Sequence, residues 1–201
     1  SAPAALVIAK IIYPETSTPE TSGNNVELSK VSNEENFLEA LGNGATDGMK
    51  LAINIAAMLI AFLSVIAMIN WLLSLISFGD TILSIELILG YIFMPLSFLM
   101  GAPWDEAHIL GSLMGQKLVL TEFIAFSNLA TYSNEISQKT ATIAAYALCG
   151  FANFASIGIQ LGGIGSIVPN RKKDLAKLVV KAMFGGALAS WLTATIAGLL
   201  I

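Results

Sequence analysis

The stretch that most constrains this chain is residues 140–170, which carry no charged side chain and are long enough to cross a bilayer as a helix. Within it, the run ALCGFANFASIGIQLGGIG, residues 147–165, is interrupted by Asn153, Ser156 and five glycines. A simple anchor has no need for an amide and a hydroxyl at mid-depth, whereas a transporter that binds a polar solute inside the membrane does. We therefore expect a broken transmembrane helix that contributes to a binding site.

The rest of the chain is also strongly apolar. Of its 201 residues, 55% are hydrophobic and 12% are charged, and that charged share is about half of the share in an average soluble domain. Three more stretches without charge are long enough to lie in a bilayer as helices: residues 51–79, 87–104 and 182–201. Because backbone polar groups must be satisfied within lipid, these stretches predict an all-α integral membrane protein that crosses a cell membrane (plasma or inner) several times.

The first 43 residues divide into a short apolar piece and a polar connector. Residues 1–12 are too short to span a bilayer, so we expect the end of a preceding transmembrane helix, and the chain to be the C-terminal part of a larger protein. Residues 13–43 are polar and contain proline and glycine, which predicts a solvated linker, with a regulatory tail as the alternative. Within it, Ser32–Glu35 are expected to cap a short helix that ends at Gly42.

Residues 44–102 are expected to form a scaffold transmembrane helix followed by an interfacial helix. The longest helix is predicted over 44–77, with Trp71 near its far end at the depth of a membrane interface. The apolar piece at 81–101 is interrupted by Pro95, so it suits either a full span or a helix at the interface, and we favour the interface.

Residues 103–170 are expected to contain the binding site, as a re-entrant hairpin followed by the broken helix. Two half-length apolar pieces flank Glu122, and such a break at membrane depth survives only where it faces protein or water. An ionisable group there is costly unless it is paired or hydrated. Glu122 is therefore predicted to accept hydrogen bonds from substrate hydroxyls or to carry a proton or cation. The alternative is an ion pair with Lys117.

Residues 171–201 are predicted to form a basic loop and the last transmembrane helix. Four basic residues between positions 171 and 177 place this loop in the cytoplasm by the positive-inside rule. Counting the spans backwards also places the linker at 13–43 in the cytoplasm.

Enzymatic and nucleic-acid-binding functions have little support in the sequence. His108 is the sole histidine, which leaves neither a histidine cluster for a metal nor a Ser-His-Asp arrangement. Asp105 and Glu106 are adjacent, so on a helix they do not face one another, and we expect them to favour the helix start. Cys149, the one cysteine, is expected to be a small packed residue. No basic patch with interleaved aromatic residues is present, and we expect no catalytic residue, cofactor or metal site.

Phe151, Asn153 and Ser156 offer groups that complement Glu122. An amide and a hydroxyl each donate and accept hydrogen bonds, and an aromatic ring stacks on a flat heterocycle. With the carboxylate, this set suits a solute that has a vicinal diol and an aromatic base. The alternative is that the polar groups join neighbouring helices to one another.

Three long segments carry a family resemblance. They are GNGATDGMKLAINIAAMLIAFLSVIAMIN, GAPWDEAHILGSLMGQKLVLTEFIAFSNL and ALCGFANFASIGIQLGGIGSIVPNRKKDLAK. These segments resemble the C-terminal half of the concentrative nucleoside transporters, and the first residues, SAPAALVIAKIIYPET, are similar to the family segment that precedes this half. The resemblance covers nearly the whole chain.

The resemblance implies a cation-coupled nucleoside symporter, trimeric, built from two inverted repeats that each contribute a re-entrant hairpin and a broken helix. This chain would be the second repeat. In the family, the carboxylate of the second hairpin and the Asn and Ser of the GFANxxS motif hold the ribose, and the Phe packs near the base. Here these residues are Glu122, Asn153, Ser156 and Phe151, and Thr121 stands where many relatives have Asn.

The resemblance also implies where the chain depends on other parts of a transporter. The coupling ion, sodium or a proton, would be bound mainly by an upstream half that this sequence lacks. We expect nucleoside uptake by alternating access, and the alternative is a non-transporting membrane module that binds nucleoside or assembles with partner subunits.

Overall fold

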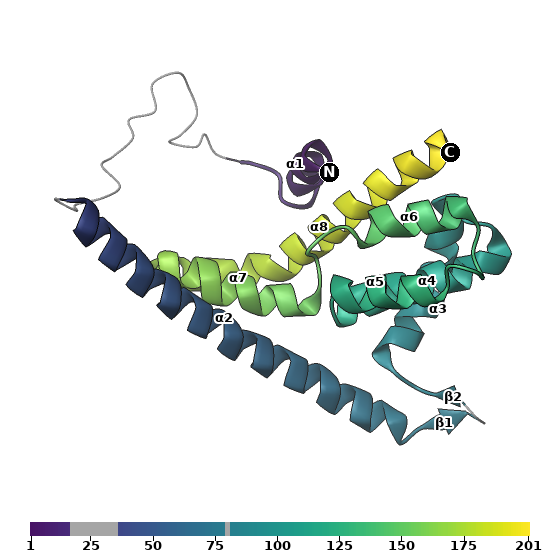
Figure 1. Cartoon of the computed structure of the whole chain (residues 1–201), viewed down its shortest axis with the longest axis horizontal. Helices are drawn as coiled ribbons and strands as arrows, with labels where there is room; N and C mark the ends of the chain where they lie inside the picture. The colour runs from purple at the N-terminus through teal and green to yellow at the C-terminus, as the bar shows by residue number, and fades with distance from the viewer. Residues whose placement is uncertain (17–35, 79–80) are drawn as a thin grey trace.

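The computed structural model describes residues 1–16, 36–78 and 81–201, and in these residues the chain is almost entirely helical (Figure 1). This confirms the predicted helical fold. Two short strands pair in an antiparallel hairpin, with Ser77 opposite Ile82. The elements in chain order are α1 (Ala2–Ile12), α2 (Phe37–Ser74), β1 (Ser77–Phe78), β2 (Thr81–Ile82), α3 (Ile85–Leu99), α4 (Trp104–Val119), α5 (Glu122–Thr131), α6 (Gln138–Leu148), α7 (Phe154–Ile167), the 3₁₀ turn η1 (Pro169–Arg171) and α8 (Lys172–Leu200).

Two helical stretches in the described residues are long and apolar enough to cross a membrane. They are α2, of 38 residues, and the stretch Pro169–Leu200, which joins η1 to α8. The apolar part of α2 is almost entirely exposed, whereas α8 buries nearly half of its apolar part against the rest of the chain. Helices α1, α3 and α7 are apolar but shorter than a span.

The helix α2 begins earlier than the sequence predicts. It starts at Phe37, where the Asn36 side chain accepts a hydrogen bond of 2.9 Å from the backbone of the first turn, and it continues unbroken through Gly42. The predicted helix end at Gly42 is therefore wrong. Glycine ends a helix when its backbone turns left-handed, and among the described residues only Gly101 does so. Ser32–Glu35, the predicted cap, lie outside the described residues.

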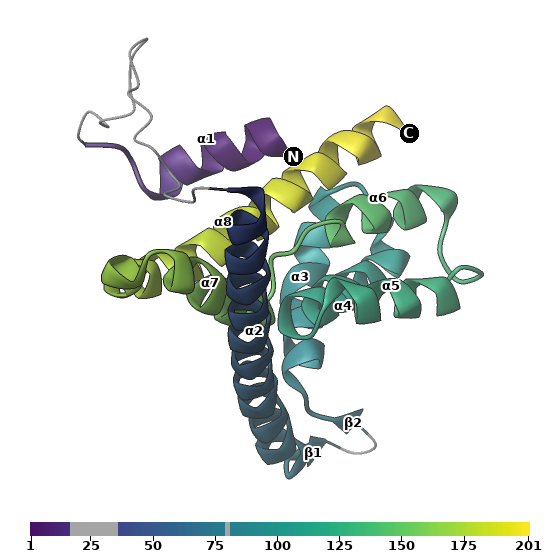
Figure 2. The ribbon, with the colours of Figure 1, turned by 60° about the vertical axis from the view of Figure 1, so that its left-hand side comes forward.

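Helix α7 lies along α2, while α4, α5 and α6 lie together in a separate group (Figure 1 and Figure 2). Two glycines allow α7 to approach the α2 backbone closely. A Cβ on Gly158 would lie 3.1 Å from the backbone oxygen of Met58, and one on Gly162 would lie 3.2 Å from that of Asn54. The long exposed helix thus meets the second half of the broken helix along a small-residue face.

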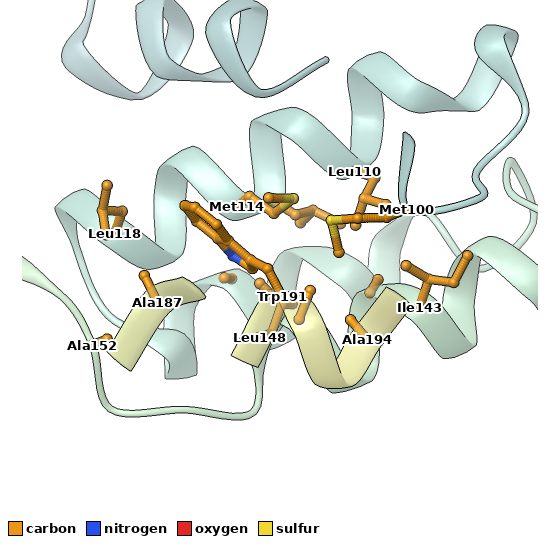
Figure 3. Close-up of a cluster of buried hydrophobic side chains, with 14 of the residues drawn as sticks. Met100, Leu110, Met114, Leu118, Ile143, Leu148, Ala152, Ala187, Trp191 and Ala194 are labelled. Atoms are coloured by element: carbon orange, nitrogen blue, oxygen red, sulfur yellow. The ribbon is translucent and has the colours of Figure 1, made fainter. Parts of the chain in front are cut away.

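The buried core lies between α4, α6 and α8. Figure 3 shows Trp191 of α8 beside Met114 and Leu118 of α4 and above Leu148 of α6. Phe93 of α3 meets the Trp191 ring edge-on, with the ring centres 5.1 Å apart. This core fixes the hairpin and the broken helix relative to the last helix.

Candidate functional site

Helices α4 and α5 form a hairpin whose tip carries Glu122. Helix α4 ends at Val119 and α5 begins at Glu122, where the helix dipole favours a carboxylate. The hydroxyl of Thr121 caps α5 by accepting a 3.4 Å hydrogen bond from the first turn. The two arms lie side by side (Figure 1 and Figure 2) and are joined by the Asn128 Nδ2, which donates to Gln116 Oε1 at 2.6 Å.

The helix formed by the apolar run at 140–170 is broken at the position of the polar residues in that run. Helix α6 ends at Leu148, and α7 begins at Phe154 with Asn153 as its N-cap. The Asn153 Oδ1 accepts a hydrogen bond of 2.7 Å from the Ser156 backbone, and the Ser156 Oγ accepts one of 3.3 Å from the Asn153 backbone. This capping box starts the second half of the broken helix.

A hydrogen bond joins the hairpin tip to the break between α6 and α7. The Asn153 Nδ2 donates to Glu122 Oε2 at 3.0 Å. Because the oxygen of the same amide caps α7, the Asn153 side chain is held at both ends. Asn153 is buried and Glu122 is half-buried, and a carboxylate that accepts one hydrogen bond keeps further acceptor capacity.

Ser156 and Phe151 occupy different surroundings from this pair. The Ser156 hydroxyl is buried and donates to the Asn153 backbone oxygen at 2.6 Å, so it stabilises the capping turn. Phe151 lies in the break between the two half-helices and is 58% exposed. The structure therefore brings Glu122 and Asn153 into contact, directs the Ser156 hydroxyl into the capping turn and leaves Phe151 exposed.

Two features of the hairpin have no clear signal in the sequence. Lys117 is fully buried, and in the described part of the chain it forms no ion pair with Glu122 and its Nζ has no hydrogen-bond partner. Glu106, expected only to favour the start of its helix, accepts hydrogen bonds from the Ser137 backbone at 3.1 Å and from its hydroxyl at 2.8 Å. The burial of Lys117 and the hydrogen bonds of Glu106 both depend on segments far apart in sequence, which local patterns do not reveal.

Cys149 and the acidic residues are the other side chains that could react or bind a metal. Cys149 is exposed where α6 gives way to the break, so the prediction of a packed cysteine is wrong. Across residues 1–16, 36–78 and 81–201, no group of three or more His, Cys, Asp or Glu side chains is arranged to hold a metal ion. The chemistry available at the hairpin tip is therefore hydrogen bonding and charge.

A hairpin tip that meets an interrupted helix is the kind of site that membrane transporters build from discontinuous helices. Comparison with known proteins gives the family. The family model of the Na+ dependent nucleoside transporter C-terminus matches residues 1–198. The chain belongs to this nucleoside transporter family.

The similarity to known proteins extends over the whole length of this chain. The uncharacterized transporter YutK of Bacillus subtilis is 46% identical over 203 residues, which are 100% of this chain and 50% of YutK. The nucleoside permease NupC of Helicobacter pylori is 41% identical over 208 residues, again 100% of this chain and 49% of NupC. The chain therefore spans about half the length of these curated relatives.

Solved structures of the transporter CNTnw have the same fold. A variant in an outward-facing state matches with a TM-score of 0.84 at 39% identity, over 99% of this chain and 48% of that one. An inward-facing, substrate-bound state of CNTnw matches with a TM-score of 0.73 at 41% identity, over 98% of this chain and 48% of that one.

Proposed function

We propose that this chain forms the second half of a cation-coupled nucleoside symporter, with the binding site in residues 103–170. The observation that carries this proposal is the 3.0 Å hydrogen bond from Asn153 to Glu122. It places an amide and a carboxylate together where two helical elements are interrupted. Such interruptions at membrane depth suit a site that faces a water-filled cavity and a polar solute.

The four predicted site residues would act together on one nucleoside. Glu122 accepts hydrogen bonds from the two ribose hydroxyls, and Asn153 contributes the neighbouring amide. The exposed ring of Phe151 packs against the base. Ser156 acts through Asn153, because its hydroxyl already donates within the capping turn. The similarity to NupC, a nucleoside permease, supports this class of substrate.

The same proposal assigns roles to the larger elements. Helices α4 and α5 enter the cell membrane as a re-entrant hairpin, and α2 serves as scaffold and subunit contact in a homotrimer. The hairpin and the broken helix move against α2 during alternating access. Solved outward-facing and inward-facing states of CNTnw support a cycle of this kind.

The coupling ion in this proposal is sodium or a proton, bound mainly by residues outside this chain, and no cofactor is required. The family description, Na+ dependent, supports sodium. Uptake of labelled uridine and adenosine into proteoliposomes, measured separately under a sodium gradient and a proton gradient, would identify the ion. Binding of nucleoside without uptake under either gradient would instead support a non-transporting binding module.

The substitution Glu122→Gln tests the site directly. It keeps the size of the side chain but removes the charge, and a hydrogen bond to a charged group contributes about 1.5–3 kcal/mol. We expect nucleoside uptake at subsaturating concentration to fall by about 10-fold or more, with membrane insertion unchanged. Glu135→Gln, on an exposed acid in the loop before α6, is the matched control and should transport normally. Uptake at the control level in Glu122→Gln would disprove the site assignment.

A further inference from the structure

Lys117 is the largest fully buried side chain in the described part of the molecule. Lysine normally keeps its ammonium in water and buries only its carbon stem. Here the Nζ is buried too, and it has no hydrogen-bond partner among residues 1–16, 36–78 and 81–201. The ion pairs formed within the same residues do not include it. An ammonium in this position needs an opposite charge that acts on it over a distance.

The Lys117 ammonium lies where the hairpin meets the broken helix. Lys117 belongs to the last turn of α4, where the helix dipole favours a cation. Its Nζ lies 3.8 Å from the point that a Cβ on Gly150 would occupy, within the break after Leu148. The C-terminal ends of α4 and α6 therefore both lie close to this one ammonium.

Glu122 is the carboxylate at the tip of the same hairpin, and it binds the same break: its Oε2 accepts from Asn153, three residues after the glycine that the Lys117 Nζ approaches. Glu122 does not touch Lys117, because its carboxylate accepts the hydrogen bond from Asn153 instead. Lys117 is fully buried whereas Glu122 is half-buried, so the ammonium lies deeper than the carboxylate. A solute that reaches the exposed part of Glu122 would not contact Lys117.

We propose that Lys117 is a positioning residue that supplies the countercharge for Glu122 in the substrate site. A nucleoside is uncharged, so it cannot neutralise the carboxylate that binds it. Opposite charges attract over several ångströms where little water separates them. Lys117 thereby keeps Glu122 directed at the break, next to Asn153, both with and without substrate. This inference rests on the proposed function of the site.

The test is a double-mutant cycle on the intact protein in lipid nanodiscs. Binding of uridine and of adenosine is measured by calorimetry for the wild type, Lys117→Met, Glu122→Gln and the double variant. Methionine is apolar and similar in length, so it fills the same space without the charge. We expect Lys117→Met to weaken binding by about 10-fold, within the range measured for coupled neighbours. Because Lys117 acts through Glu122, the double variant should bind no more weakly than Glu122→Gln alone.

Thermal unfolding of the same four proteins provides a second measurement. Glu122→Gln leaves the Lys117 ammonium without its countercharge, so it should lower the melting temperature. The double variant removes both charges and should recover part of that loss. If Lys117→Met yields too little folded protein for calorimetry, Lys117→Gln replaces it in the same cycle. Lys173→Met, on an exposed lysine of α8, is the matched control and should behave as wild type.

The possible outcomes separate this inference from the proposed function. If the wild type binds neither nucleoside, both are wrong. If the wild type binds and Glu122→Gln binds weakly, but Lys117→Met binds as tightly as wild type, only the countercharge role is wrong. Losses that add in the double variant would also overturn it, because they would show that Lys117 acts independently of Glu122.

Discussion

At the scale of single residues, Asn153 has two separate tasks. Its Oδ1 caps α7, and its Nδ2 binds Glu122. Serine and alanine distinguish these tasks, because serine is a good N-cap and neither side chain can reach Glu122 as the amide does. The helix cap and the substrate contact can therefore be tested independently at one position.

We expect Asn153→Ser and Asn153→Ala to lose nucleoside binding to a similar extent. Asn153→Ala should also lower the free energy of unfolding by about 1 kcal/mol more than Asn153→Ser, since alanine cannot cap the helix. Calorimetric binding and thermal unfolding of both variants check this. Equal stabilities would contradict the cap, and binding retained by the serine variant would contradict the amide's role at the site.

The site was only partly predictable at this scale. Glu122 and Asn153 stand out because each is polar within an apolar run, where a polar group needs a reason. The Ser156 hydroxyl points into the capping turn, where it donates to Asn153. The prediction of Ser156 as a ligand does not include this turn. The burial of Lys117 depends on the break after α6, about thirty residues away in the chain.

At the scale of elements, α3 and α4 are held together by backbone-to-backbone contact. A Cβ on Gly111 would lie 2.6 Å from the Gly90 backbone oxygen and 2.9 Å from the Met94 backbone nitrogen. Backbone cannot move aside as a flexible side chain can, so even one methyl group would force the two helices apart.

Gly111→Ala should therefore lower the free energy of unfolding by about 1–3 kcal/mol. Gly163→Ala on α7 is the matched control, because its new Cβ would meet only the Leu51 Cδ1 at 3.6 Å. That substitution should be neutral or slightly stabilising, since alanine favours helix. Thermal unfolding in detergent compares the two, and equal melting temperatures would show that the α3–α4 contact tolerates a side chain.

The existence of most helices follows from the sequence better than their limits do. Two half-length apolar pieces around Glu122 predict the hairpin arms, and the polar interruption of a charge-free run predicts the broken helix. The start of α2 is not predicted, because Gly42 resembles a helix end although Asn36 provides a cap further upstream. The two-residue strands between α2 and α3 have no signal strong enough to predict them.

At the scale of the whole molecule, the α2–α7 contact is where the proposed movement would take place. A Cβ on Gly158 would lie 3.2 Å from the Met58 Cβ, close to the spacing of a disulfide. If α7 moves against α2 during transport, a covalent link at this point should prevent the cycle.

We expect the pair Met58→Cys and Gly158→Cys, in a Cys149→Ser background, to stop uptake when oxidised and to regain it when reduced. The single Gly158→Cys variant controls for the new contact with the Phe62 ring, whose Cδ2 would lie 2.9 Å away. Uptake into proteoliposomes before and after reduction is the measurement. Full uptake by the oxidised pair would mean that α7 and α2 keep the same relative position throughout transport.

The length of α2 has a mechanical consequence. At 1.5 Å per residue its 38 residues extend about 57 Å, nearly twice the hydrocarbon thickness of a bilayer. The charged pair Asp47 and Lys50 lies just before the charge-free part of the helix. If α2 crosses the membrane as proposed, the turns from Phe37 to Lys50 extend about 20 Å beyond its apolar part into water. A force applied to these turns would then tilt the helix and reach α7, which packs against it, without any contact with the nucleoside.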